Sequence, residues 1–186
     1  MTSPFRDPPV LEGLLLAPLV MVDAPFLLAH FSDPEVVRHL DIEPLASLAE
    51  AQEIIAWAEE RRAKAEGLRW SIREERGGEF IGTCGFNALC WEEGGKGEIA
   101  YDLSRRWWGK GLMAEILPAL ARFGFGPLGL HRLEAKVDPE NRRSCAVLER
   151  SGFRREGVLS AQGYWKGAWR AQVLYRLERD VAAGPD

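Results

Sequence analysis

Hydrophobic and polar positions follow two different periods along the chain, and the change of period marks the predicted elements. Apolar residues recur every three or four positions in four segments, which predicts helices over residues 23–31, 48–65, 112–125 and 142–150. A further short helix is predicted to end near His39 or Leu40. Asp23 is a candidate N-cap for the first helix, and Gly152 is placed to end the last.

Alternation of apolar and polar residues predicts strands over residues 11–18, 68–75, 80–86, 96–103, 132–137, 153–158 and 172–177. An aromatic-rich loop with Tyr164, Trp165 and Trp169 is predicted between the last two strands. Strands and helices are mixed in this order, which indicates an α+β architecture with one central sheet. No internal repeat or linker divides the chain, so residues 1–186 are expected to form a single domain.

Composition narrows the class of protein. Hydrophobic residues make up 46% and charged residues 28%, which is ordinary globular usage. The net charge of −4 argues against a nucleic-acid partner, which usually requires clustered basic residues. Cys84, Cys90 and Cys145 match neither a disulfide framework nor a metal motif. No apolar stretch approaches the roughly 18 residues of a membrane helix, so we expect a cytoplasmic protein with no membrane partner.

A glycine-containing loop between strand and helix carries the most chemical information. The strand is predicted to end at Leu103, and the loop Trp107-Trp108-Gly109-Lys110-Gly111 leads directly into the helix of residues 112–125. A helix start presents free N–H groups and a positive dipole end, which suits a phosphate or pyrophosphate. The alternative is that Gly109 and Gly111 only make a turn.

Three runs in the same region resemble one family. They are E-I-A-Y-D-L-S-R-R-W-W-G-K-G-L-M-A-E, V-D-P-E-N-R-R-S and L-E-R-S-G-F. Together they resemble the GNAT superfamily of N-acetyltransferases, and most closely its ribosomal-protein N-terminal (RimJ/RimL-like) branch, which carries W-G-x-G. The resemblance covers residues 11–177 in element order and is specific over residues 98–157. It implies a mixed, mostly antiparallel sheet of about seven strands flanked by helices, acetyl-CoA as co-substrate and no metal.

Two registers of the glycine motif are possible. The literal superfamily match begins at Arg106. We prefer the register that places Trp108 at the position of the usual Arg or Gln, because it keeps Leu103 at the strand end and Glu115 at the branch's usual glutamate. Met113 then departs from the usual Gly or Ala.

The resemblance assigns the cofactor site residue by residue. Backbone N–H groups hold the pyrophosphate in the family, and Leu103 corresponds to the position that bonds the pantetheine arm through its backbone. The matching segment here comprises Trp108, Gly109, Lys110, Gly111, Leu112 and Met113. Side chains of Arg105, Arg106 or Lys110 could add charge near the phosphates or lie in solvent.

Asn141 and Ser144 form a second motif. Their spacing at a helix start is typical of an N-cap and a first-turn residue. By resemblance, Asn141 also contacts the pantetheine arm, and Ser144 lies near the sulfur and protonates the leaving thiolate. Other superfamily members use a tyrosine for this step at the position where Leu148 stands here.

The base that accepts the amine proton is harder to assign. Glu98, Asp102 and Glu134 are candidates, but each could instead be a solvated residue paired with a cation such as Lys136. We select Glu98, because its place in E-I-A-Y matches a glutamate common in the branch.

Two departures bear on the acceptor. Gly163 and Ala171 stand where relatives carry an acidic residue. The hypothesis is transfer of an acetyl group to a primary amine, as on a ribosomal-protein N-terminus, by a monomer or homodimer. Alternatives are acetylation of a polyamine, amino acid or antibiotic, favoured if the loop of residues 164–169 closes a narrow pocket, and a non-catalytic acyl-CoA-binding domain.

Overall fold

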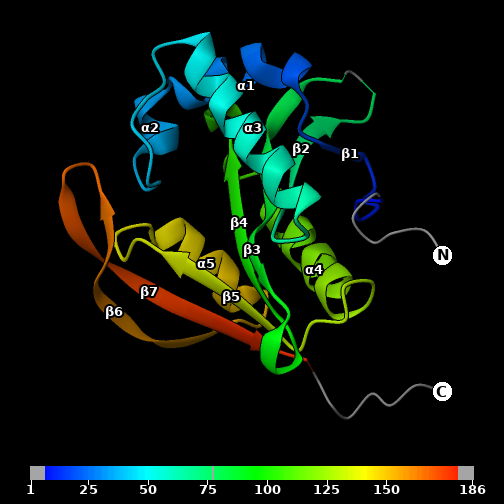
Figure 1. Cartoon of the computed structure of the whole chain (residues 1–186), viewed down its shortest axis with the longest axis vertical. Helices are drawn as coiled ribbons and strands as arrows, with labels where there is room; N and C mark the ends of the chain where they lie inside the picture. The colour runs from blue at the N-terminus through cyan, green and yellow to red at the C-terminus, as the bar shows by residue number, and fades with distance from the viewer. Residues whose placement is uncertain (1–6, 77, 180–186) are drawn as a thin grey trace.

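Seven strands and five helices make up the computed structural model, which describes residues 7–76 and 78–179 (Figure 1). In chain order the elements are β1 (Leu14–Pro18), α1 (Ala24–Phe31), α2 (Pro34–Val37), α3 (Leu48–Ala63), β2 (Leu68–Glu74), β3 (Phe80–Cys90), β4 (Lys96–Leu103), α4 (Leu112–Phe125), β5 (Arg132–Val137), α5 (Arg142–Arg150), β6 (Arg154–Trp165) and β7 (Ala168–Glu178). The α+β prediction is confirmed, and β4, α4, β5 and α5 have the predicted bounds.

The sheet is mixed and opens in its middle. Its strand order is β1-β2-β3-β4-β5-β7-β6, and every neighbouring pair is antiparallel except β4 with β5. The parallel pair is joined only over Lys96–Glu98 on β4, and beyond Glu98 the two strands separate toward their carboxyl ends (Figure 1). Because α4 and α5 both follow these ends in the chain, two helix N-termini lie at the opening.

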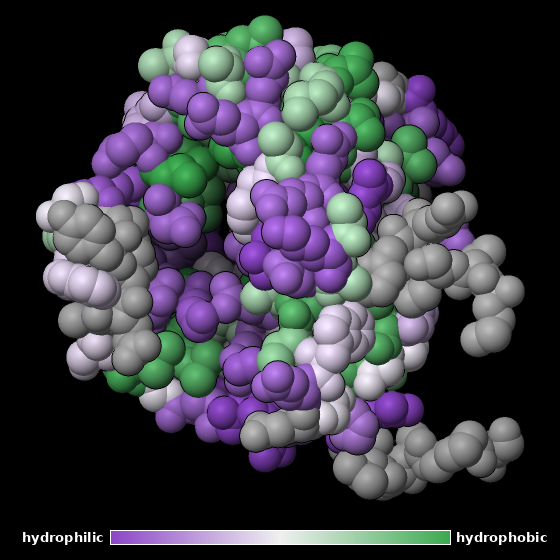
Figure 2. Space-filling view, in the orientation of Figure 1, coloured by the Kyte–Doolittle hydropathy of each residue, from purple (hydrophilic) through white to green (hydrophobic). Residues whose placement is uncertain are grey.

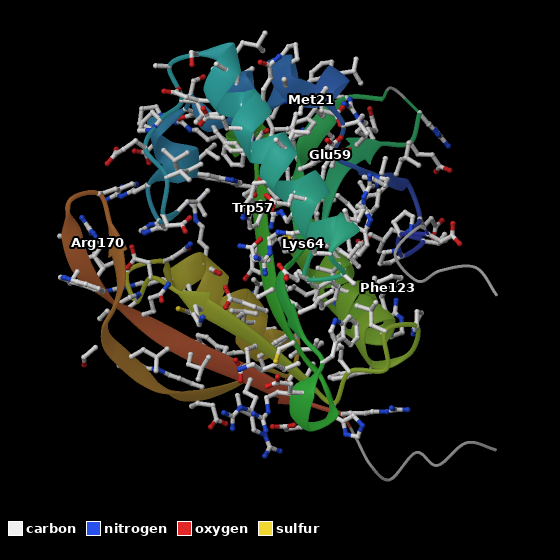
Figure 3. All side chains as sticks on the ribbon, viewed as in Figure 1. Met21, Trp57, Glu59, Lys64, Phe123 and Arg170 are labelled. Carbon is white, nitrogen blue, oxygen red and sulfur yellow. The ribbon has the colours of Figure 1, made fainter. Side chains whose placement is uncertain are left out.

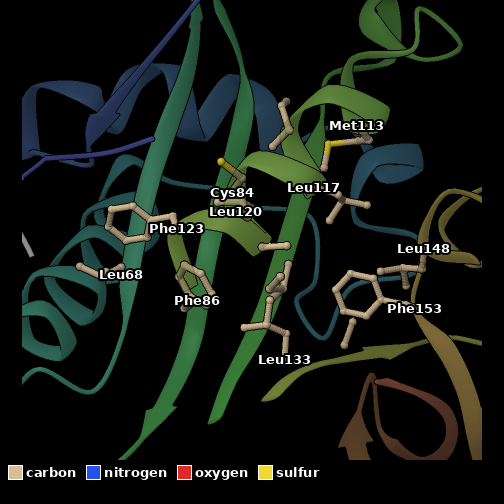
Figure 4. Packing of buried hydrophobic residues seen from close by; sticks show 14 of the residues in the cluster. Leu68, Cys84, Phe86, Met113, Leu117, Leu120, Phe123, Leu133, Leu148 and Phe153 are labelled. Atoms are coloured by element: carbon tan, nitrogen blue, oxygen red, sulfur yellow. The ribbon is translucent and has the colours of Figure 1, made fainter. Parts of the chain in front are cut away.

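One face of the sheet carries the main hydrophobic core. Leu117, Leu120 and Phe123 of α4 are buried against side chains of β2, β3 and β5 (Figure 4). Trp70 of β2 meets Phe123 edge to face, with ring centroids 5.3 Å apart. Aromatic pairs of this geometry contribute beyond the area they bury. The packing fixes α4, and therefore its N-terminus, relative to the end of β4.

The opposite face carries a buried polar network beneath α1. His30 bonds Asp102 through Nε2 at 2.6 Å and Ser104 through Nδ1 at 2.8 Å. Arg69 and Thr83 donate to the other carboxylate oxygen of Asp102, at 3.0 and 2.6 Å. Burial raises the pKa of the Asp102 carboxyl, but the hydrogen bonds and charges of its partners outweigh burial and lower that pKa below its ordinary value.

Asp23 occupies the predicted N-cap position of α1 but does not cap that helix with its side chain. Its carboxylate instead accepts the N–H of Val20 at 3.1 Å and bonds Arg73 at 2.6 Å. The capping prediction is wrong in this respect, because the partly buried Arg73 on β2 engages one carboxylate oxygen and the preceding turn engages the other.

The predicted loop with Tyr164, Trp165 and Trp169 is also wrong. The last two strands extend through it as a long hairpin, in which Trp165 pairs with Ala168. The two turn residues, Lys166 and Gly167, have φ of 51° and 71°. Positive φ at both positions is the geometry of a two-residue turn that continues the strand twist.

The helices are short. The longest, α3, has 16 residues, and within the described ranges no helix is long and apolar enough to cross a membrane.

Candidate active site

The N-terminus of α4 is exposed to solvent, and its backbone N–H groups are available for hydrogen bonds to a ligand. Gly111 is its N-cap with φ of 80°, Gly109 has φ of 73°, and no side chain caps the helix. The first N–H to bond back is that of Ala114, 2.9 Å from the carbonyl of Gly111. The preceding N–H groups therefore face outward at the positive end of the helix dipole, which is a site for an anion.

This N-terminus is one wall of a groove with a volume of about 920 Å³. The groove is lined by the loop after β4, the first turn of α4 and one face of α5. Its arginines are Arg38, Arg142, Arg143 and Arg150. The guanidinium of Arg143 lies 5.1 Å from the ring centre of Trp108. The groove thus combines helix N–H groups with arginines, a combination suited to a phosphate-bearing ligand.

The other predicted cations lie elsewhere. Arg105 pairs with Asp33 at 3.8 Å, and Arg106 pairs with Glu79. Lys110 stacks on Trp107, with Nζ 4.2 Å from the ring centre. Their side chains are surface groups, as the alternative interpretation held, and the groove takes its positive charge mainly from α5.

The end of β4 presents its backbone to the opening. The N–H of Ser104 bonds the carbonyl of Ile81 on β3, so by the alternation of strand hydrogen bonds Leu103 directs its own groups away from β3. The Leu103 carbonyl accepts the indole N–H of Trp108 at 2.6 Å. Trp108 therefore joins the strand end to the glycine loop.

Met113 and Leu112 complete the first turn of α4. The Met113 side chain is only 9% exposed and packs into the main core (Figure 4). This departure from the usual Gly or Ala therefore directs its bulk inward, and the backbone of the turn remains on the groove.

Asn141, Ser144 and Tyr101 meet where α5 faces β4. The Asn141 side chain accepts the N–H of Ser144 at 3.2 Å, so the predicted N-cap is confirmed. The hydroxyl oxygens of Ser144 and Tyr101 are 2.7 Å apart. Burial raises the pKa of Tyr101 to about 12, and the bond to Ser144 offsets only part of this effect. Tyr101 therefore keeps its proton at neutral pH, whereas Leu148, at the usual tyrosine position, is completely buried.

A second, smaller cavity of about 130 Å³ adjoins the groove between β4 and β5. The two share His39, Leu40, Tyr101, Asn141 and Ser144. The smaller cavity is predominantly acidic, since its charged lining residues are Asp41, Glu98, Lys136 and Asp138. Figure 2 shows the molecule hollowed where β4 and β5 separate, and Figure 3 shows Arg170 of β7 and Trp57 of α3 on opposite sides of this region.

The three candidate bases have different surroundings. Glu98 lines the smaller cavity and pairs with Lys136 at 2.6 Å. Asp102 is held in the buried network beneath α1, and Glu134 lies 4.0 Å from Arg176. Within the described residues, no cluster of three His, Cys, Asp or Glu side chains could hold a metal ion.

Sequence reasoning missed two parts of the site. Tyr101 falls within the predicted strand of residues 96–103 but receives no role from the sequence, because 43 positions separate it from Ser144. The arginines of α5 were quoted within V-D-P-E-N-R-R-S without a role. For these arginines, the available signal in the sequence was a pair of adjacent basic residues at a helix start.

Comparison with known proteins places these features in context. A family model described as an acetyltransferase (GNAT) domain matches residues 13–154. The N-acetyltransferase p20 of Bacillus licheniformis is 39% identical over 173 residues, which cover 93% of this chain and 97% of that protein. The ribosomal protein uS5-alanine N-acetyltransferase of Escherichia coli is 34% identical over 99 residues, which cover 53% of this chain and 51% of that protein.

Solved structures share the fold. The ribosomal L7/L12 alpha-N-protein acetyltransferase RimL, solved in complex with coenzyme A, superimposes with a TM-score of 0.82 at 23% identity. The match covers 92% of this chain and 97% of that one.

Proposed function

The chain belongs to the GNAT acetyltransferase family and is an acetyl-CoA-dependent N-acetyltransferase, and we propose that its acceptor is the α-amine of a protein N-terminus. The observation that carries the proposal is the junction of the two cavities at Tyr101 and Ser144. The larger groove suits a long ligand that bears phosphates, and the smaller cavity suits a cationic amine.

The residues of the groove fit acetyl-CoA. The free N–H groups of the segment from Gly109 to Met113 would hold the pyrophosphate, whereas the N–H of Trp108 bonds the carbonyl of Arg105 at 3.1 Å. Arginines of α5 would add charge beside the pyrophosphate. The backbone of Leu103 and the amide of Asn141 would bond the pantetheine arm. This placement would bring the thioester to the end of the groove at Ser144.

The acidic lining supports an ammonium acceptor. Asp41, Glu98 and Asp138 outnumber Lys136 around a space of about 130 Å³. A terminal residue with a small side chain, such as alanine or serine, suits this volume, and the rest of a peptide would leave through the surface hollow. Similarity to an enzyme named a ribosomal protein uS5-alanine N-acetyltransferase supports a protein acceptor.

Transfer requires a neutral amine and a proton for sulfur. The amine nitrogen attacks the thioester carbonyl carbon, and a base removes a proton from nitrogen. The C–S bond then breaks with its electron pair on sulfur, which takes a proton from Ser144. Tyr101, hydrogen-bonded to Ser144 and protonated at neutral pH, can resupply that hydroxyl, and the proton taken from nitrogen returns through solvent to Tyr101. Glu98 is the carboxylate of the smaller cavity that the resemblance selects as base.

A small-molecule amine is the second candidate acceptor, favoured by one contact. Nζ of Lys166, at the tip of the β6–β7 hairpin, donates to the carbonyl of Val37 at 2.6 Å and to that of Arg38 at 3.2 Å. This contact ties the hairpin to the end of α2, next in sequence to His39 and Leu40, which line both cavities. It would narrow the entrance to the acceptor cavity and favour a slender polyamine or an amino acid over a peptide chain.

Competition between acceptors tests the proposal. The purified protein is incubated with acetyl-CoA and peptides that begin with Ala, Ser or Met, or with spermidine and free amino acids, and thiol release is followed. Peptides with a blocked N-terminus and an internal lysine are the matched control. Acetylation of the free N-termini alone supports the proposal, and turnover confined to small amines supports the second candidate.

A further inference from the structure

His39 and Asp138 form a hydrogen-bonded pair at the junction of the two cavities. His39 follows α2, Asp138 follows β5, and the ring Nδ1 lies 2.8 Å from Oδ2 of the carboxylate. The side chains are 22% and 11% exposed, so the pair is shielded but reaches the cavity surface. Two elements that are 99 residues apart in sequence therefore present one imidazole to the site.

The carboxylate fixes which ring nitrogen carries the proton. The other oxygen of Asp138 accepts the N–H of Glu140 at 2.9 Å, which holds the carboxylate in place. An ionised carboxylate only accepts hydrogen bonds, so Nδ1 of His39 must be the donor. In the neutral ring Nε2 then carries the lone pair, and it has no hydrogen-bond partner among the described residues.

Location separates His39 from the carboxylates nearby. The His39 ring lines both cavities, together with Tyr101 and Ser144. Glu98 lines only the smaller cavity and is committed to Lys136 at 2.6 Å. Asp41 also lines only the smaller cavity, where an exposed carboxylate can attract the ammonium group.

We propose that His39, oriented by Asp138, is the catalytic base that takes the proton from the acceptor amine. The amine enters as an ammonium ion, loses one proton to Nε2, and attacks the thioester carbon to form the C–N bond. The C–S bond then breaks with its electron pair on sulfur, which takes a proton from Ser144, and the second proton lost by nitrogen passes through solvent to restore the Ser144 hydroxyl. The imidazolium that forms is stabilised by Asp138 and returns its proton to solvent. Glu98 and Lys136 then contribute to binding of the acceptor amine, and Ser144 remains the proton donor to sulfur. The inference rests on the proposed acceptor cavity.

The experiment compares His39→Gln, His39→Ala and Asp138→Asn with His131→Gln, a matched control at an exposed histidine that lines neither cavity. kcat/KM is measured against pH with an Ala-initiated peptide and with spermidine, and acetyl-CoA binding is measured by calorimetry. Asp41→Asn and Glu98→Gln enter the same pH series, because these residues and Lys136 line the smaller cavity together with His39.

General-base catalysis predicts that His39→Gln lowers kcat/KM at least about 100-fold without changing the acetyl-CoA affinity. The acidic limb of the pH profile should disappear with it, and added imidazole should partly restore His39→Ala, which a purely structural role would not allow. Asp138→Asn should lower kcat by removing the partner that sets the tautomer.

Two results separate this inference from the proposed acceptor. If His39→Gln keeps the wild-type rate and acidic limb, the base assignment is overturned while the acceptor class stands. If the wild-type protein acetylates spermidine and not the peptide, the proposed acceptor fails, and the effect of His39→Gln on spermidine still decides the base.

Discussion

The hydroxyl oxygen of Tyr101 lies 2.7 Å from that of Ser144, and this pair joins β4 to α5 at the meeting point of the two cavities. The contact places a protonated phenol behind the serine that is proposed to protonate sulfur. Because Tyr101 has its pKa raised to about 12, its proton remains available well above neutral pH.

Ser144→Ala should therefore lower kcat by about 100-fold, within the usual range for general acid catalysis. Tyr101→Phe should have a smaller effect, because Ser144 remains and only its resupply is lost. Stopped-flow measurement of thiol release checks both variants, with acetyl-CoA affinity expected to stay at the wild-type value. Equal activity of Ser144→Ala and wild type would rule out the assigned donor.

Gly111 offers a test of the groove with an internal control. Gly111 and Gly129 have φ of 80° and 66°, and an added Cβ would meet nothing within 4 Å at either position. Alanine should cost each protein about 1–2 kcal/mol of backbone strain. Only Gly111 lines the groove, so Gly111→Ala alone should weaken acetyl-CoA binding, by about 10-fold for one lost hydrogen bond to a charged group. Calorimetry together with urea unfolding separates the two effects, and equal loss of affinity in both variants would contradict the placement.

Lys166→Ala should change acceptor choice without changing acetyl-CoA affinity. Loss of the bonds to the Val37 and Arg38 carbonyls frees the hairpin tip from α2, so the entrance should widen and peptides should gain relative to spermidine. Lys64→Ala, which removes an exposed helix lysine paired with Glu60, is the control. An unchanged ratio of peptide to spermidine kcat/KM would show that this contact does not set specificity.

Asp102→Asn should destabilise the fold, since it leaves His30 and Arg69 without their buried anion. Breaking such a pair costs about 3–5 kcal/mol. Because the pKa of Asp102 is lowered in the folded state, its ionised form contributes stability above the unfolded value of 3.8, and this is lost as pH falls through the folded value. Urea unfolding measured from neutral to acidic pH should show this loss of unfolding free energy in the wild-type protein and not in Asp102→Asn. Glu60→Gln, at an exposed pair, should leave the curve unchanged.

Much of the fold could be predicted where local signals were strong. β4 ends and α4 begins around a glycine loop, and α5 lies between the Asn141 cap and Gly152, which has φ of 88° and bonds Glu149 in a helix-ending motif. These signals for the ends of helices and strands depend only on neighbouring residues. The predicted bounds of these elements therefore agree with the structure. The β6–β7 hairpin was missed because Lys166 adopts a positive φ that its sequence context does not indicate.

Within the candidate site, only the glycine loop and the start of α4 could be predicted from the sequence. The glycine loop and helix start are contiguous in sequence, so Gly109 and Gly111 were accessible to reasoning from spacing. The contacts of Tyr101 with Ser144, of His39 with Asp138 and of Glu98 with Lys136 arise from tertiary packing. The sequence alone allowed Glu98 to be either a catalytic base or the partner of a cation. Only the separation of β4 from β5 brings the residues of these contacts to one cavity.

The most direct test of the account is amine-dependent release of free thiol from acetyl-CoA, measured for the wild-type protein and Gly111→Ala over a series of acetyl-CoA concentrations. The account predicts saturable release that requires an Ala-initiated peptide with a free α-amine, with KM for acetyl-CoA raised by the substitution and the acetyl group found on the peptide N-terminus by mass spectrometry. Thiol release that no amine increases, or a KM that Gly111→Ala leaves unchanged, would contradict it.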